Sequence, residues 1–182
     1  MSAIETPRLI LARWGDDDLG GLRELTQRPE VMRHVGARVA LTREQVEQEH
    51  AAKLAHWREH GFGARAAMRR DTSAWIGYAV LQHPRPDVVE LDPSEVEIGW
   101  LLLPSAWGRG YATEAAGALI EEGFQRLQLD RIVARYQPAN AASGRIMEKI
   151  GMRFERREVD RHGNDIRVCS IDNPLRDTGA AS

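Results

Sequence analysis

The spacing of apolar residues changes along the chain and predicts a series of helices and strands. Apolar residues recur at helical spacing after Asp16 and in several later segments. These later helical segments span 29–32, 42–61, 112–127 and 140–150. Shorter apolar or alternating runs, bounded by polar turns, predict strands. The strand segments span 8–14, 63–69, 75–82, 95–103, 131–136, 154–159 and 166–171.

Local signals support the ends of two of these helices. Asp16 stands where its side chain can cap the helix that follows it. Thr42 and Gln45 have the spacing of a capping box, and Gly61 is suited to end the helix that they begin. We therefore expect a long helix between a capped start at Thr42 and a glycine stop.

The order of the elements predicts the fold class. The stretch from Glu95 to Tyr136 reads strand, helix, strand, and a crossover helix joins parallel strands. Polar turns at 70–73 and 161–164 instead join neighbouring strands as antiparallel hairpins. We therefore expect an α/β (α+β) fold, with a mixed, mostly antiparallel sheet and helices on both faces. Residues 1–176 form a single domain in this prediction, and the small polar residues 177–182 form a flexible tail.

Composition and charge exclude several classes of protein. The net charge of −2 over 182 residues gives no general attraction to nucleic acid or to anionic membranes. No apolar run approaches the ~18 residues of a membrane span, and no secretory signal is visible, so we expect a cytoplasmic protein. The single Cys169 excludes an internal disulfide. His56 and His60 are four residues apart but lack a third ligand, so no metal is expected.

A glycine-rich turn is the most informative local feature of the chain. It spans residues 107–114, which read Trp-Gly-Arg-Gly-Tyr-Ala-Thr-Glu, between a predicted strand and a predicted helix. A helix start leaves about four N–H groups without intrahelical partners, and its dipole favours negative charge. Because Gly108 and Gly110 lack a Cβ, the backbone there can approach phosphate oxygens closely. The turn is therefore suited to a diphosphate, although a plain strand-to-helix connection is the alternative.

This turn and several other segments together resemble one enzyme family. The matching segments are 97–100 (Glu-Ile-Gly-Trp), 104–115, Asn140 with Ser143, 149–151 (Lys-Ile-Gly) and 6–11 (Thr-Pro-Arg-Leu-Ile-Leu). On these residues the chain resembles the Gcn5-related N-acetyltransferases (GNAT), in the branch that includes ribosomal-protein N-terminal acetyltransferases. The resemblance covers nearly the whole chain and is most specific in its centre.

The resemblance implies acetyl-coenzyme A (acetyl-CoA) as acyl donor and an amine as acceptor. In the family two neighbouring parallel strands splay apart, and here these are 95–103 and 131–136. The pantetheine arm enters the gap along the first strand, and the diphosphate rests on the glycine turn. The family often has Gln or Arg where this chain has Trp107, which removes one side-chain donor. The implied coenzyme-binding residues are Leu102, Leu103, Trp107, Gly108, Arg109, Gly110, Tyr111, Ala112, Thr113, Asn140 and Ser143.

The resemblance also implies two catalytic residues. Direct attack on a thioester needs a neutral amine, whereas a lysine-like ammonium has a pKa near ~10 and an α-amine near ~8. Glu97 matches the family's strand glutamate and is implied as general base, directly or through water. The resemblance places Ser143 near the thioester sulfur, where it is implied as proton donor to the departing thiolate. Many members of the family use a tyrosine further along this helix, and this chain has none there. The alternatives are an ion-paired or exposed carboxylate for Glu97, and helix capping for Asn140 and Ser143.

Several points stay open at this stage. The acceptor is a protein N-terminus or a small amine, and the sequence does not separate them. A non-catalytic module that binds coenzyme A and senses or regulates would keep the turn without turnover. Another donor, such as succinyl-CoA, would need a basic pocket, for which Arg135 and Arg145 are candidates. A homodimer is a further open point, whereas nucleic acid and membrane are not expected partners.

Overall fold

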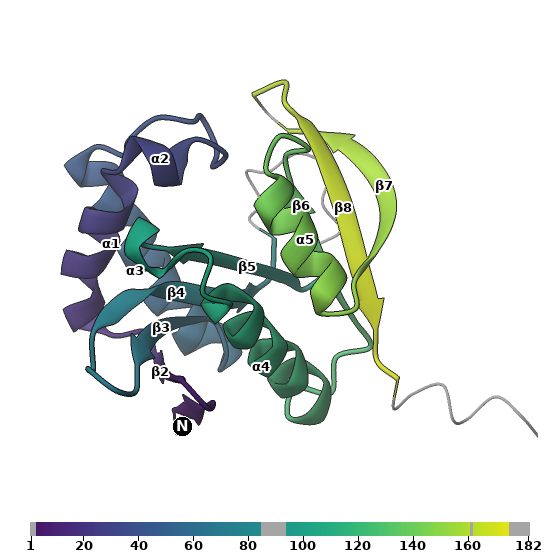
Figure 1. The fold of residues 1–182 in the computed structure, drawn as a ribbon, viewed down its shortest axis with the longest axis horizontal. Coiled ribbons are helices and arrows are strands. Elements are labelled where there is room, and N and C mark those ends of the chain that lie inside the picture. The colour runs from purple at the N-terminus through teal and green to yellow at the C-terminus, as the bar shows by residue number, and fades with distance from the viewer. Residues whose placement is uncertain (1–2, 85–93, 161, 175–182) are drawn as a thin grey trace, which may run out of the picture.

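The computed structural model describes residues 3–84, 94–160 and 162–174, and its strands form a single sheet (Figure 1). The strands are β1 (Ile4–Glu5), β2 (Leu9–Arg13), β3 (Ala64–Arg69), β4 (Trp75–Gln82), β5 (Glu97–Leu102), β6 (Arg131–Tyr136), β7 (Arg153–Val159) and β8 (Asp165–Asp172). They lie in the order β1-β2-β3-β4-β5-β6-β8-β7. Only β5 and β6 pair in parallel among these described strands, which confirms the predicted mixed, mostly antiparallel sheet.

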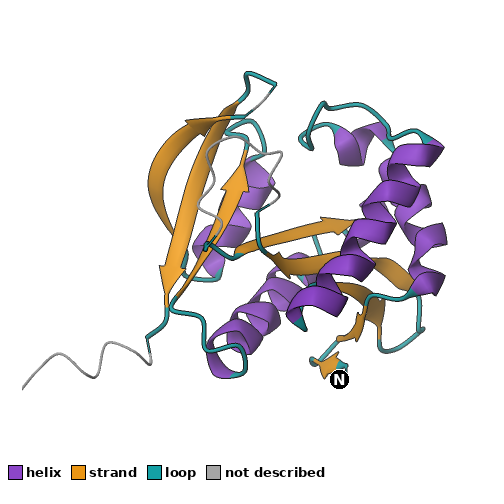
Figure 2. Cartoon of the chain, turned by 180° about the vertical axis from the view of Figure 1, so that it is seen from behind, coloured by secondary structure: helices purple, strands orange, loops and turns teal. Residues whose placement is uncertain are grey.

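Helices cover both faces of the sheet (Figure 2). They are η1 (Asp16–Asp18), α1 (Leu19–Thr26), α2 (Pro29–Met32), α3 (Arg43–His60), η2 (Pro104–Ala106), α4 (Tyr111–Gln125) and α5 (Ala141–Lys149). On one face α4 packs against β2, β4 and β5 and buries Ala115 and Leu119 in the larger hydrophobic core. On the other face α1 and α3 pack together over a second core that contains Trp14, Leu22 and Trp57. None of the described helices is long and apolar enough to cross a membrane.

The ends of α3 follow the signals in its sequence. The Thr42 hydroxyl accepts a hydrogen bond from the Gln45 N–H at 3.3 Å, and the Gln45 side chain accepts one from the Thr42 N–H at 2.8 Å. Gly61 ends the helix in the left-handed region, with φ 70°. The predicted capping box and glycine stop are therefore confirmed, since each satisfies backbone groups that the helix ends leave unpaired.

The predicted cap at Asp16 is wrong. Gly15 occupies the cap position, and Asp16 is already inside the short helix η1. Asp18 accepts the hydrogen bond from the Gly15 N–H at 2.8 Å. Asp18 also accepts a hydrogen bond from the Trp75 indole at 3.1 Å, so a tertiary contact selects among the three neighbouring aspartates.

The parallel strands β5 and β6 separate close to where their pairing begins. Among the described residues they share the single register Glu97–Val133, next to a hydrogen bond from the Val133 N–H to the Val96 carbonyl at 3.0 Å. β5 pairs along its whole length with β4, whereas β6 pairs along its whole length with β8 (Figure 1). This geometry confirms the splayed parallel pair that the family resemblance implied.

Three sequence predictions extend beyond the described part of the chain. The three prolines of segment 83–93 predict a loop, and most of that segment lies outside the described residues. One residue of the turn 161–164 and the predicted tail 177–182 also lie outside them. The flanking elements, β4 and β7 with β8, are described and lie close to their predicted bounds.

Candidate active site

The predicted phosphate turn joins η2 to α4 through two glycines in the left-handed region. Gly108 has φ 71° and Gly110 has φ 80°, and Gly110 holds the cap position of α4. A Cβ at Gly108 would meet nothing within 4 Å, so conformation rather than space favours glycine there. Because Gly110 has no side chain to cap the helix, the first N–H groups of α4 stay available to an anion.

A cavity of about 400 Å³ lies at this turn. Its walls come from α2 and the residues after it, the end of β5, the turn with the start of α4, and one side of α5. The sequence-predicted residues that line it are Leu102, Trp107, Gly108, Gly110, Tyr111, Ala112, Thr113, Asn140 and Ser143. The fold therefore brings most of the predicted binding residues together, and their contact with a coenzyme stays a prediction.

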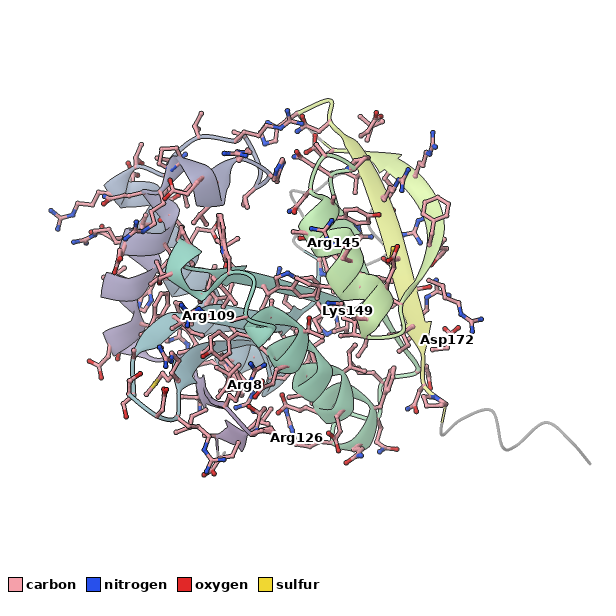
Figure 3. All side chains as sticks on the ribbon, in the orientation of Figure 1. Arg8, Arg109, Arg126, Arg145, Lys149 and Asp172 are labelled. Carbon is pink, nitrogen blue, oxygen red and sulfur yellow. The ribbon has the colours of Figure 1, made fainter. Side chains whose placement is uncertain are left out.

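Two of the predicted binding residues do not line the cavity. Leu103 is buried beside α1 and α2, and its N–H donates to the Ile76 carbonyl at 2.8 Å. The Leu103 carbonyl accepts a hydrogen bond from the Ala106 N–H at 2.9 Å, so both backbone groups are already engaged within the protein. The Arg109 side chain is exposed beside the start of α4 (Figure 3).

The edge of β5 that faces the gap carries backbone groups available for pairing. In an antiparallel pair successive residues direct their backbone groups to opposite sides. Since the Leu103 N–H points to β4, the backbone groups of Trp100 and Leu102 point toward β6. The Leu102 carbonyl accepts a hydrogen bond from the Trp107 indole at 2.8 Å. The single polar group of the Trp107 side chain is therefore used inside the protein.

Asn140 caps α5 at the cavity wall. Its Oδ1 accepts a hydrogen bond from the Ser143 N–H at 3.2 Å. The capping interpretation of Asn140 is therefore confirmed, and a coenzyme contact by the same side chain stays a prediction. The cap uses the backbone of Ser143, so the Ser143 hydroxyl is separate from it. Both side chains border the cavity.

Glu97 lies in β5 at the point where β6 diverges, and it is not among the residues that line the cavity. Its carboxylate lies 3.5 Å from Nη1 of Arg135. Burial raises the pKa of Glu97 above its usual value, the Arg135 charge opposes this, and the negative charges of Glu158 and Glu95 add to it. An ion-paired carboxylate is therefore observed, with a pKa moved toward the range that suits a general base.

Arg135 connects Glu97 to a wider ionic cluster. Its guanidinium binds Glu95 at 2.8 Å and Glu158 at 3.0 Å. Arg156 joins the same two carboxylates, at 3.3 and 2.8 Å. Three carboxylates and two guanidiniums leave one excess negative charge when all are ionised. Arg135 is thus occupied by carboxylates and does not line the cavity, whereas Arg145, the other arginine considered for an anionic acyl group, does.

Comparison with known proteins identifies the family. Residues 8–153 match the family model for the acetyltransferase (GNAT) domain. The chain belongs to the GNAT family. A similar protein, an uncharacterized N-acetyltransferase named YnaD from Bacillus subtilis (strain 168), is 34% identical over 154 residues. The matched residues cover 84% of this chain and 83% of YnaD.

Two solved acetyltransferase structures share the fold of this GNAT chain. The ribosomal L7/L12 alpha-N-protein acetyltransferase RimL, in complex with coenzyme A, has a TM-score of 0.74 and 15% identity, over 94% of this chain and 98% of RimL. The spermidine N-acetyltransferase from Vibrio cholerae, in complex with coenzyme A and spermine, has a TM-score of 0.72 and 16% identity. The match covers 92% of this chain and 97% of the spermidine N-acetyltransferase. These likenesses support the GNAT fold. Family membership makes the protein an acetyl-CoA-dependent acyltransferase.

Sequence reasoning missed one wall of the acetyltransferase cavity. This wall consists of Glu30, Val31, Arg33, His34 and Val35, in α2 and just after it. These residues lie far before the glycine turn in the chain and carry no recognisable motif. Only tertiary folding therefore places them beside the turn. Within the described ranges, no group of three or more His, Cys, Asp or Glu side chains could hold a metal ion.

The α5 wall was only partly recognised from sequence. Besides Asn140 and Ser143 it contributes Ala142, Arg145, Ile146 and Lys149. Ile146 and Lys149 follow Ser143 at steps of three residues, so helical spacing could have found them. Figure 3 shows Arg145 and Lys149 on α5, where both line the cavity, and Arg109 beside the start of α4. This side of the cavity therefore carries positive charge.

Proposed function

We propose that this acetyltransferase moves an acetyl group from acetyl-CoA to a primary amine, which attacks the thioester directly. The observation that carries the proposal is the pair of left-handed glycines that opens α4 onto the cavity at the edge of β5. Free N–H groups at a helix start suit a diphosphate. An unpaired strand edge suits the amide groups of an extended pantetheine arm.

Each part of the coenzyme has a matching part of the cavity. In the proposal the diphosphate lies on the turn from Gly108 to Thr113. The pantetheine pairs with the backbone groups of Trp100 and with the N–H of Leu102, since the Leu102 carbonyl already accepts the Trp107 hydrogen bond. Leu103 has no contact with the coenzyme in this proposal, because it does not line the cavity and both its backbone groups are engaged. The guanidinium of Arg109 and the cations of α5 add positive charge near the phosphates.

The proposed reaction uses one base and one acid. Glu97 accepts a proton from the ammonium, directly or through water, and leaves a neutral amine. The amine nitrogen then forms a bond to the thioester carbon, and the carbon–sulfur bond breaks. Ser143 donates a proton to the departing thiolate. The nitrogen carries an extra proton after the attack and releases it to solvent as the amide forms, and Ser143 regains a proton from solvent. Glu97 also releases its proton to solvent before the next cycle. No covalent bond to the protein forms at any stage.

The position of Gly99 supports a route between the cavity and Glu97. Every second residue of a strand lies on the same face, so β5 carries Glu97, Gly99 and Leu101 on one face. Leu101 lines the cavity. A Cβ at Gly99 would meet only the Val80 side chain, at 3.5 Å. The absence of a side chain at Gly99 leaves room for the amine or a bridging water over the strand.

We infer that the acceptor occupies the end of the cavity near α2. The glycine turn and α5 provide the features that suit the coenzyme, whereas Glu30, Arg33 and His34 supply polar groups on the α2 wall. The names of the two similar structures refer to a protein N-terminus and to a polyamine. A protein N-terminus or a small amine is accordingly the proposed acceptor class.

The experiment that tests the function is an amine panel that follows thiol release from acetyl-CoA. The panel contains peptides with free N-termini, polyamines and single amino acids, and mass spectrometry identifies the acetylated product. We expect thiol release that depends on an added amine. Coenzyme binding without thiol release for every amine would contradict catalysis and favour a sensing module. Because Arg145 lines the cavity, succinyl-CoA is run in parallel, and its preferred use would replace acetyl-CoA as the donor.

A further inference from the structure

Arg8, just before β2, binds the backbone of the glycine turn although about a hundred residues separate them. Its Nη1 donates a hydrogen bond to the Arg109 carbonyl at 2.8 Å. Figure 3 shows Arg8 and Arg109 together near the start of α4. A Cβ built on Gly110 would lie 3.2 Å from Nη2 of Arg8, so the guanidinium lies directly against the turn. This contact belongs to neither the coenzyme cavity nor the catalytic pair described above.

We propose that Arg8 is a positioning residue that orients the peptide between Arg109 and Gly110 for binding the coenzyme diphosphate. The inference rests on the proposed function, since it assumes a diphosphate at this turn. In a trans peptide the carbonyl and the following N–H point in opposite directions. By holding the Arg109 carbonyl, Arg8 therefore directs the Gly110 N–H away from itself. Gly110 lines the cavity, whereas Arg109 does not.

The turn needs such a restraint because glycine leaves the peptide free to rotate. Gly110 has φ 80°, and glycine populates positive and negative φ about equally well. A rotation of the Arg109–Gly110 peptide by half a turn exchanges a type II-like arrangement, with positive φ, for a type I-like one. It would also present a carbonyl oxygen, and not an N–H, to the phosphate. The charged hydrogen bond from Arg8 favours the arrangement that binds an anion.

Glu114 fixes Arg8 in this position. One carboxylate oxygen of Glu114 accepts hydrogen bonds from the Arg8 backbone N–H at 2.8 Å and from the Thr6 hydroxyl at 2.6 Å. The other accepts one from Nε of Arg8 at 2.6 Å, with Nη2 at the same distance. The Arg8 guanidinium also lies over the Tyr111 ring, 4.9 Å from its centre. Residues of α4 thus fix the position of Arg8, and Arg8 in turn fixes the Arg109 carbonyl of the glycine turn.

The Glu114 carboxylate stays ionised at neutral pH. Burial raises its pKa, but the hydrogen bonds from Thr6 and Arg8 outweigh burial and leave the pKa below the usual value. The Glu114 side chain is only 14% exposed, so its charge is well shielded from solvent. The ion pair with Arg8 therefore persists across the pH range in which the enzyme is assayed.

The chain offers a matched control for Arg8. Arg70 also holds the N-terminal segment, through a hydrogen bond to the Thr6 carbonyl at 3.0 Å and an ion pair with Glu5 at 3.6 Å. The exposed fractions of the two side chains are similar, 49% for Arg8 and 46% for Arg70. No hydrogen bond or ion pair in the described structure joins the Arg70 side chain to the turn 107–110. The variant Arg70→Ala therefore measures the general effect of loosening the N-terminal segment.

The test compares two donors, acetyl-CoA and acetylpantetheine, which lacks the diphosphate. Initial rates give KM and kcat for wild type, Arg8→Ala, Arg8→Lys and Arg70→Ala. We expect Arg8→Ala to raise KM for acetyl-CoA by about ten-fold or more, the effect of losing a charged hydrogen bond. KM for acetylpantetheine and kcat at saturating donor should stay within about two-fold, and Arg70→Ala should match wild type. KM for acetyl-CoA in Arg8→Lys should lie between the values for wild type and Arg8→Ala, since an ammonium keeps the charge but not the forked geometry.

Three results separate the possible failures. An unchanged KM for acetyl-CoA in Arg8→Ala would overturn the positioning role. Equal rises in KM for both donors would also overturn it, because the effect would then be independent of the diphosphate. If wild type itself binds neither donor, or binds both equally, the proposed diphosphate site fails whatever Arg8 does. If Arg8→Ala does not fold, the same comparison in Arg8→Lys and Glu114→Gln decides the inference.

Discussion

The Trp107 indole N–H donates a hydrogen bond to the Leu102 carbonyl at 2.8 Å, although the Trp107 residue is 47% exposed. This bond joins the first residue of the glycine turn to the last residue of β5. The intervening residues include the short helix η2, so the bond closes a compact loop. The turn is therefore held at a fixed place relative to the strand edge that the pantetheine is proposed to use.

Replacing Trp107 with Phe removes this hydrogen bond and keeps an aromatic ring. A neutral hydrogen bond contributes about 1 kcal/mol, so we expect coenzyme A affinity to fall about five-fold by calorimetry. Trp107→Gln retains a side-chain N–H donor of the kind common in the family and should recover part of the loss. Equal affinity in Trp107→Phe and wild type would show that the bond does not position the turn.

Gly110 combines a left-handed backbone with the proposed phosphate contact. Gly110→Asp adds a strained Cβ and a negative charge beside the diphosphate. We expect coenzyme A affinity to fall by well over ten-fold, since like charges at a phosphate site repel. Unchanged binding by calorimetry would remove the turn from the coenzyme site.

A second left-handed glycine separates backbone strain from the loss of binding. Gly163, in the turn between β7 and β8, has φ 76° and nothing within 4 Å of a built Cβ. Gly163→Asp therefore imposes a similar conformational strain at a residue that does not line the cavity. We expect Gly163→Asp to lower the thermal midpoint and leave coenzyme A affinity unaltered.

The raised pKa of Glu97 predicts the acid limb of the pH–rate profile. A base works as the carboxylate, so wild-type turnover should fall as pH drops through a pKa above the usual value of about 4.3. Glu97→Gln should lower turnover by about a hundred-fold just above that pKa, and the gap should narrow as the amine loses its own proton near pH ~8–10. Coenzyme A affinity should be spared. A pH–rate profile identical to wild type would exclude Glu97 as the base.

A change at Glu95 tests the same acid limb of the pH–rate profile and leaves the proposed base Glu97 in place. Its negative charge raises the pKa of Glu97, and it shares Arg135 with Glu97. Glu95→Gln removes that charge and leaves Arg135 more available to Glu97. The acid limb should therefore move to lower pH, with turnover at neutral pH largely kept. A shift to higher pH would contradict this account of the cluster.

Ser143→Ala tests the proposed acid without disturbing the helix cap. The Asn140 side chain accepts its hydrogen bond from the Ser143 backbone N–H, which alanine retains. We expect turnover to fall by about ten-fold to a hundred-fold, within the range that a general acid supplies, with an unchanged thermal midpoint. Asn140→Ala should instead lower stability by about 1 kcal/mol through loss of the cap. Normal turnover in Ser143→Ala would reduce Ser143 to a structural residue.

Removal of Arg135 should destabilise the protein in a pH-dependent way. Arg135→Met leaves three carboxylates without their shared cation, and loss of one partner from a buried ion pair costs about 3–5 kcal/mol. The loss should be largest at pH 8 and smaller at pH 5, because protonation removes the repulsion. Arg131→Met, at a 40% exposed side chain on the same strand, should cost less than about 1 kcal/mol. Denaturant titrations at both pH values measure these differences, and equal losses would contradict the burial argument.

Local patterns predicted the parts of the structure that short-range forces decide. The capping box at Thr42 and the glycine at 61 were readable because their hydrogen bonds join residues a few positions apart. The cap predicted at Asp16 was wrong, because three successive aspartates could serve it. In the structure Asp18 accepts both the local hydrogen bond from the Gly15 N–H and the long-range one from the Trp75 indole. The sheet order was also hidden, since β8 inserts between β6 and β7 through long-range pairing.

The same division applies to the site. The sequence by itself determined the glycine turn, because positive φ at Gly108 and Gly110 restricts the residue type, and it determined the family through the motifs around that turn. Only the tertiary structure placed α2 on the cavity wall, paired Arg135 with Glu97 and brought Arg8 to the Arg109 carbonyl. These contacts join residues far apart in the chain, and their energies depend on burial and charge that exist only once the chain has folded.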